Sequence, residues 1–133
     1  MSDPILVTYA TRYGSTQEVA EKVAATLRES GPAVDVQPAK QVRSLAGYRA
    51  VVLGAPLYMF DWLKDARDFV SRHRAALEQM PVAVFTLGPT EDKEEDWTEA
   101  RKQLDKVLSK FPWLMPTAVE LFGGKFDPAR LTF

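Results

Sequence analysis

The chain has 133 residues, of which 46% are hydrophobic and 26% charged, and its net charge is −1 at pH 7. This length suits one domain with one core, and the small net charge argues against a protein that binds nucleic acid or a membrane surface. Cysteine is absent and His73 is the only histidine, which excludes disulfides and thiolate catalysis and leaves little basis for a metal site. No apolar run is long enough to cross a bilayer, and the first strand begins too near Met1 for a signal peptide, so we expect a cytoplasmic protein.

The first predicted strand, Ile5–Ala10, is rich in β-branched and aromatic residues, as is typical of a buried parallel strand. A helix is predicted directly after it, from residue 16 to residue 30, because Val19, Val23 and Leu27 recur four positions apart. The helix should end there, because Gly31-Pro32 is a strong stop.

Further strands are predicted at residues 33–36, 50–54, 82–86 and 117–122, with an irregular helix or turn at 45–48. Two more helices lie between them. The apolar face of the first consists of Trp62, Ala66, Phe69, Val70, His73 and Leu77. That of the second consists of Trp97, Ala100, Leu104, Val107, Leu108 and Phe111. On such a face His73 is expected to be a partly buried structural residue rather than a catalyst.

The five strands alternate with helices, which predicts an α/β fold, a doubly wound parallel sheet formed by a single domain over residues 1–133. In such sheets ligands bind beyond the carboxyl ends of the strands, at a topological switch point. Three loops reach that edge, at residues 11–16, 55–61 and 87–96, and they define the candidate site.

The first loop consists of Thr11, Arg12, Tyr13, Gly14, Ser15 and Thr16. Ser15 and Glu18 fit a capping box with Ser15 as the N-cap, and a helix N-terminus after a strand suits a phosphate. The loop has neither the Gly-Lys-Ser/Thr of a P-loop nor the GxGxxG of a dinucleotide site. The pattern Thr11-x-x-Gly14-x-Thr16 resembles the flavin mononucleotide (FMN) phosphate loop of flavodoxins. An ordinary strand–helix turn is the alternative interpretation. Arg12 could add positive charge near a phosphate, although a loop arginine is more often merely solvated.

The second loop carries large apolar side chains, namely Pro56, Leu57, Tyr58, Met59 and Phe60. They suit the flat face of an isoalloxazine ring, so we expect flavin contact by at least Tyr58 or Phe60, whereas Trp62 is assigned to the core face of the following helix. The third loop begins with Thr86, Leu87, Gly88 and Pro89. Its glycine would allow a close approach of the backbone to a ligand, although a plain Gly-Pro turn explains the same residues. The acidic residues from Glu91 to Asp96 are expected to complement the dipole of the next helix.

The chain resembles the flavodoxin-domain group that includes menaquinone-dependent protoporphyrinogen oxidase. The matching segments are Thr11–Thr16, Gly54–Tyr58 with Trp62-Leu63, and Phe122–Pro128. The resemblance implies a flavodoxin-like sheet with strand order 2-1-3-4-5 and a non-covalent FMN. Two departures stand out: the additional long loop of the protoporphyrinogen oxidases is missing, and the sequence stops at Phe133, before the final helix of the group.

The leading hypothesis is therefore an FMN-dependent oxidoreductase that exchanges electrons with a redox partner, either a quinone or an electron-transfer protein. A flavodoxin-type electron carrier is the alternative, and a net charge of −1 argues mildly against it because such carriers are highly acidic. A receiver-type signalling domain shares the strand order but requires acidic residues where this chain has Thr11-Arg12 and Ala55-Pro56.

The expected lack of a last helix has a consequence for the sheet. Both faces of a doubly wound sheet carry apolar side chains that must be covered, and only the helix at residues 16–30 would cover one of them. We therefore expect the strands at 50–54, 82–86 and 118–122 to expose part of that face. Either the polypeptide is a shortened form, or a second subunit covers the face in a homodimer.

Overall fold

The computed structural model describes residues 3–11, 14–58, 61–87 and 94–122. In this part of the chain five parallel strands form one sheet in the order β2-β1-β3-β5-β6. Counted along the chain without the short β4, this is the predicted order 2-1-3-4-5. The strands are β1 (Ile5–Tyr9), β2 (Val34–Pro38), β3 (Ala50–Tyr58), β5 (Val82–Leu87) and β6 (Ala118–Phe122).

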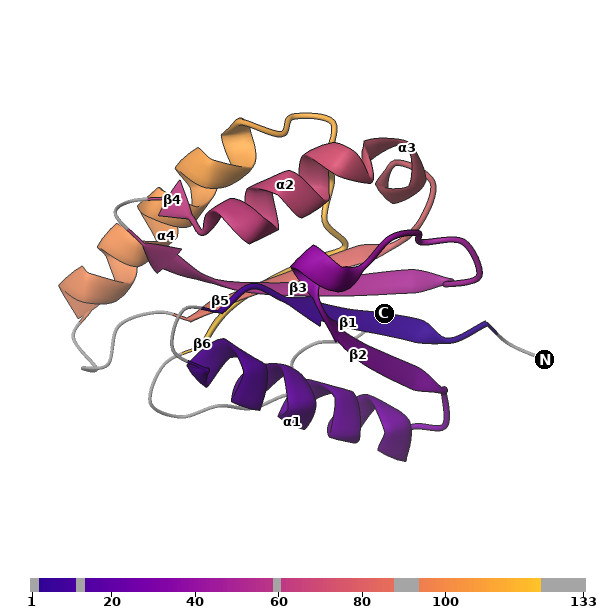
Figure 1. Cartoon of the computed structure of the whole chain (residues 1–133). Helices are drawn as coiled ribbons and strands as arrows, with labels where there is room; N and C mark the ends of the chain where they lie inside the picture. Colours follow the sequence, from indigo (N-terminus) through magenta and orange to yellow (C-terminus); the bar gives the residue numbers. More distant parts are fainter. Residues whose placement is uncertain (1–2, 12–13, 59–60, 88–93, 123–133) are drawn as a thin grey trace.

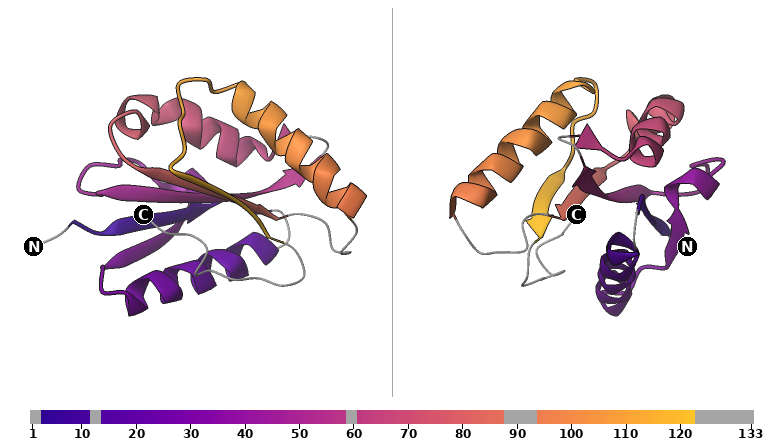
Figure 2. Two further views of the ribbon diagram at one scale, coloured as in Figure 1. Left: turned by 180° about the vertical axis from the view of Figure 1, so that it is seen from behind. Right: turned by 60° about the vertical axis from the view of Figure 1, so that its left-hand side comes forward.

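The helices of the described residues cover the two faces of the sheet unequally (Figures 1 and 2). One face carries α1 (Ser15–Glu29), and the other carries α2 (Lys64–Arg72), α3 (Arg74–Leu77) and α4 (Glu94–Ser109). A short 3₁₀ helix, η1 (Ala39–Gln41), follows β2. None of the helices in the described ranges is long and apolar enough to cross a membrane.

The strands form because their side chains are buried on both sides, as the apolar runs predicted. Along β1 the side chains alternate between two cores: Leu6 packs in the core under α2 and α4, while Val7 packs in the core under α1. The α1 core contains Ala20 and Val23 from the helix, and these are fully buried. At about 25 cal/mol per Å² of buried apolar surface, such side chains provide most of the stabilisation of the fold.

The second predicted loop is largely strand. β3 continues to Tyr58, and its last two residues pair antiparallel with β4 (Asp61–Trp62) in the register Leu57↔Trp62 and Tyr58↔Asp61. The prediction that Trp62 lies on a helix was therefore wrong, although its side chain is 1% exposed in the expected core. Trp62 lies in a strand because its backbone pairs with β3. Helical periodicity does not reveal this pairing, because Trp62 also stands at the helical spacing from Ala66.

Other boundaries differ by a few residues. The predicted helix that contains Phe69 and Leu77 divides at His73 into α2 and α3, and α4 begins at Glu94, inside the predicted third loop. The end of α1 is confirmed, with Ser30 as its C-cap. A turn occupies residues 46–47, where the Tyr48 N–H donates to the Leu45 carbonyl over 3.2 Å.

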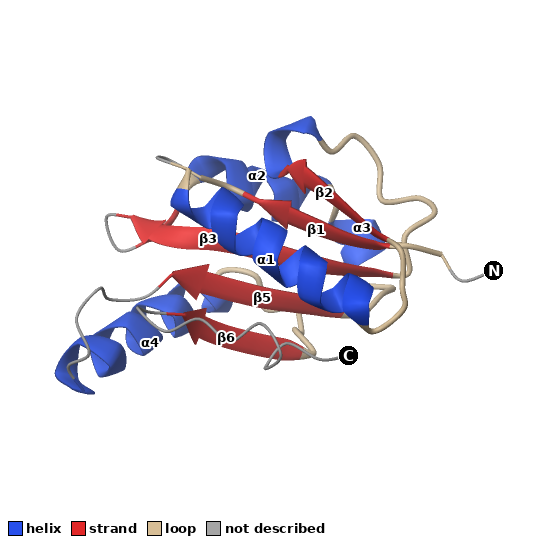
Figure 3. Cartoon of the chain, turned by 90° about the horizontal axis from the view of Figure 1, so that it is seen from below, coloured by secondary structure: helices blue, strands red, loops and turns tan. Residues whose placement is uncertain are grey.

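The α1 face of the sheet is better covered than its single described helix suggested. Figure 3 shows α1 over β1 and β3, with β5 and β6 beside it. Nevertheless, Val52, Ala83 and Phe85 are fully buried in the same cluster as the apolar residues of α1. The expectation that β3 and β5 expose this face was therefore wrong. On β6, Ala118 is half-buried, and residues 123–133 lie outside the described residues.

Candidate functional site

The candidate site lies where the carboxyl ends of β1, β3 and β5 meet. These strands are neighbours, and Tyr9, Gly54 and Phe85 form one row across them. After β1 the chain enters α1 on one face, whereas after β3 it enters α2 on the other (Figure 1). The β1–β3 pair is therefore the topological switch point of the sheet, where a crevice for a ligand is expected.

The turn between β1 and α1 is built around Gly14. This residue has a φ of 91°, in the left-handed region that favours glycine, and it is the N-cap of α1. Its N–H donates to the Thr11 hydroxyl oxygen over 2.9 Å, and its carbonyl accepts the Glu18 N–H over 3.2 Å. A side chain at position 14 would meet open space, since no atom lies within 4 Å of its Cβ position. The turn is thus held in shape with free space beside it.

The predicted capping box was wrong in its register. α1 begins at Ser15, so Gly14 and not Ser15 is the N-cap, and no side chain of the described residues caps the helix. A glycine cap leaves the first N–H groups of the helix without a side-chain acceptor. These groups and the positive end of the helix dipole suit the phosphate of a cofactor such as FMN.

The hydroxyl residues of this turn differ in access. Thr11 is half-buried, whereas the Thr16 side chain is 1% exposed at the start of α1. The backbone of Ser15 belongs to the helix. Arg12 and Tyr13 lie outside the described residues.

The second segment enters the site as the end of a strand. Ala55 is buried and Pro56 half-buried, and the backbone of Leu57 and Tyr58 is paired with β4. Met59 and Phe60 lie outside the described residues. Strand pairing gives Leu57 and Tyr58 a fixed backbone, which a free loop would not have.

Part of the third segment makes contacts within the sheet itself. The Thr86 side chain is fully buried, and its hydroxyl donates to the Ala55 carbonyl of the neighbouring strand. Leu87 ends β5, half-buried against the α1 core. Gly88 and Pro89 lie outside the described residues.

Gly54 is a site residue whose role the sequence reasoning missed. A Cβ at this position would overlap the Cζ atom of Phe85, so the aromatic ring lies across the glycine. The Gly54 carbonyl also accepts the Ala10 N–H over 2.9 Å. The Phe85 ring therefore fills the place of a side chain at Gly54 within the α1 core. A glycine at the end of a buried strand was the available signal.

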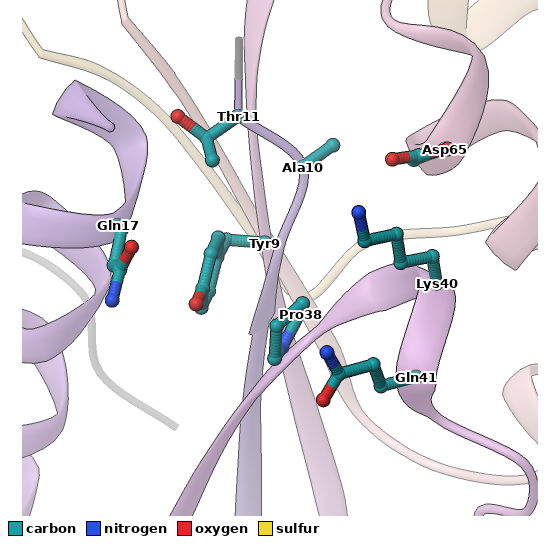
Figure 4. A pocket seen from close by; sticks show the side chains of 8 residues that line it. All are labelled: Tyr9, Ala10, Thr11, Gln17, Pro38, Lys40, Gln41 and Asp65. Atoms are coloured by element: carbon teal, nitrogen blue, oxygen red, sulfur yellow. The ribbon is translucent and has the colours of Figure 1, made fainter. Parts of the chain in front are cut away.

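A hollow lies beside the end of β1, on the side toward β2. It measures about 240 Å³ and extends over the end of that strand from α1 to η1 and α2 (Figure 4). Its lining consists of Tyr9, Ala10, Thr11, Gln17, Pro38, Lys40, Gln41 and Asp65. Burial raises the pKa of the Tyr9 phenol above its ordinary value, and the charge of Glu21 adds to this. Only Thr11 among these residues belonged to the predicted site.

Comparison with known proteins identifies the family. The sequence matches the flavodoxin domain model over residues 6–133. It is 28% identical over 111 residues to protoporphyrinogen IX dehydrogenase [quinone] from Escherichia coli K12. That match covers 81% of this chain but 61% of the relative, so the chain spans about three-fifths of the relative's length.

Solved structures with the same fold include flavodoxin 1 from Bacillus cereus, at a TM-score of 0.65 and 18% identity over 96% of this chain and 88% of that one. A flavodiiron core from Synechocystis has a TM-score of 0.71 at 16% identity, and covers 97% of this chain and 32% of that chain. These likenesses show the fold. Because the family model matches nearly all of the sequence, the chain belongs to the flavodoxin-domain family.

Proposed function

We propose that this chain binds FMN non-covalently and acts as an oxidoreductase that transfers electrons through the flavin. The observation that carries the proposal is the turn at Gly14, a left-handed glycine N-cap tied to Thr11, with open space beside it at the switch point. It offers backbone N–H groups to a phosphate and has no dinucleotide glycines. Membership of the flavodoxin-domain family supports a flavin electron-transfer role.

The proposed phosphate site comprises residues 11–16, and the proposed walls of the flavin site are Pro56, Leu57, Tyr58, Met59 and Phe60 on one side and Thr86, Leu87, Gly88 and Pro89 on the other. The bound flavin supplies the redox chemistry, and the protein holds it and sets its surroundings. The chain's own part is to orient the phosphate at Gly14 and to exclude water with the apolar residues of β3 and β5.

A quinone is the proposed electron acceptor. Its support is the relative named protoporphyrinogen IX dehydrogenase [quinone], at 28% identity. An electron carrier that serves a protein partner is the second candidate, favoured by the fold shared with flavodoxins. Steady-state turnover with soluble quinones, compared with turnover with reduced and oxidised electron-transfer proteins, separates the two. Turnover with protein partners alone would contradict the quinone assignment.

The choice of FMN over other cofactors is tested by titration. We expect quenching of flavin fluorescence with FMN at a lower dissociation constant than with FAD, and no comparable binding of NAD(P)H, because the turn lacks the glycines that admit a pyrophosphate. An absorption spectrum of the purified protein should show an oxidised flavin. Tighter binding of FAD than of FMN would contradict the proposal.

Substitutions in the turn test the phosphate site. Thr16→Ala and Gly14→Val should weaken FMN binding more than Arg12→Ala does, because a hydroxyl and a close backbone approach should matter more here than a charge that is expected to be solvated. Loss of one charge-assisted hydrogen bond costs about 1.5–3 kcal/mol. Thermal unfolding of each variant is the control, since valine is strained at a φ of 91°. A Thr16→Ala variant that binds FMN like the wild type would remove Thr16 from the site.

A further inference from the structure

Lys40 occupies a position that no motif of the sequence indicated. It lies on η1, after β2, and lines the same hollow as Thr11 of the proposed phosphate turn (Figure 4). Figure 4 shows the ammonium end of Lys40 turned toward the space between Ala10 and Asp65. Among the residues that the structure describes, no hydrogen bond or ion pair engages this ammonium group. The charge is therefore available to a ligand.

We propose that Lys40 is a binding residue for the flavin phosphate, supplying from η1 a positive charge in addition to the backbone N–H groups of the turn at Gly14. The inference rests on the proposed FMN function. A phosphate monoester carries close to two negative charges at pH 7, whereas a helix N-terminus supplies the equivalent of about half a positive charge. A lysine near the phosphate offsets part of the difference as a point charge.

The other polar residues of the hollow determine whether a substitution there should weaken or strengthen phosphate binding. Gln17 and Gln41 carry neutral amide groups, whose N–H donors can bind an anion. Asp65 carries the opposing charge on the same lining, so its carboxylate repels a phosphate and competes for Lys40. Removing the charge of Asp65 should therefore act in the opposite direction to removing that of Lys40.

The experiment compares the dissociation constants of FMN and riboflavin, which differ by the phosphate, in the wild type and in variants. Lys40→Ala should weaken FMN binding roughly threefold to tenfold, as expected for a unit charge several ångströms from a phosphate at a partly solvated site, and should leave riboflavin binding unchanged. Lys40→Arg should restore FMN binding, and Asp65→Asn should strengthen it. The difference between Lys40→Ala and the wild type should shrink as salt is raised.

Lys102→Ala is the matched control. Lys102 is an exposed lysine on α4, outside the lining of the hollow, so its removal changes the net charge of the protein equally. Lys40 is itself exposed, and its replacement should not affect folding. If Lys40→Ala and Lys102→Ala bind FMN equally well, the inference is wrong while the proposed function stands. If Lys40→Ala weakens riboflavin as much as FMN, Lys40 does not act on the phosphate. A wild type that binds neither flavin would refute the proposed function itself.

Discussion

At the scale of single residues, the burial of His73 on an apolar face makes the contacts of its ring sensitive to pH. Its side chain is 8% exposed, and its ring lies against Phe69 with centroids 4.8 Å apart. The Nε2 atom lies 3.2 Å from the Val42 carbonyl, which can only accept, so Nε2 carries the proton and donates. Burial lowers the pKa of His73, the Val42 carbonyl opposes this shift, and the charge of Arg72 adds to it. The expected burial of His73 is confirmed.

The lowered pKa of His73 predicts a loss of stability in acid. Below the ordinary histidine pKa of about 6.5, His73 binds a proton in the unfolded chain but not in the folded chain. The free energy of unfolding therefore decreases as the pH is lowered, until the pH reaches the pKa of His73 in the folded chain. Urea unfolding at a series of pH values should show this decrease in the wild type. The His73→Gln variant keeps an N–H donor without titrating and should show a smaller decrease. Parallel pH profiles for the two proteins would contradict the prediction.

At the scale of the elements, the fit of β3 against β5 depends on one glycine. The Phe85 ring fills the place that a side chain at Gly54 would take, and a methyl group cannot share that space with the ring. Strand pairing fixes both backbones, since Gly54 and Phe85 are partners in the parallel register. A larger residue at position 54 must therefore displace the ring or separate the strands.

Gly54→Ala is accordingly predicted to destabilise the fold by about 1–3 kcal/mol, the range for overpacked cores. Urea denaturation measures the change. The double variant Gly54→Ala/Phe85→Leu provides the control, because a smaller side chain at position 85 makes room for the added methyl group. Its loss should be less than the sum of the two single losses. Additive losses would show that the ring and the glycine do not compete for the same space.

At the scale of the whole molecule, a homodimer through the α1 face remains a prediction, but the predicted contact is now restricted to the edge strand β6. The buried side chains of Val52 on β3 and of Ala83 and Phe85 on β5 remove these two strands from the surface that a second subunit was expected to cover. Ala118 of the edge strand β6 is half-buried on that face. If β6 is the contact, light scattering should give a mass near twice the 14.9 kDa of one chain. A mass of one chain at all concentrations would contradict the dimer.

The order of the elements and the class of the sheet could be predicted from the sequence because they depend on local chemistry. β-branched runs such as that around Val51 form buried strands, a four-residue period such as Val19 to Leu27 forms a helix, and Gly31-Pro32 ends it. The place of the site followed from the same order, because the carboxyl ends of parallel strands share one edge.

The tertiary structure decided what depends on the backbone conformation of single residues and on contacts across the sheet. Pairing with Leu57 places Trp62 in a strand although its spacing fits a helix. The left-handed Gly14 takes the N-cap position that Ser15 was expected to hold. Phe85 reaches Gly54 across the sheet, and η1 places Lys40 on the lining of the same hollow as Thr11. No local pattern encodes the contacts across the sheet, because they exist only when the strands have aligned and the core has closed around them.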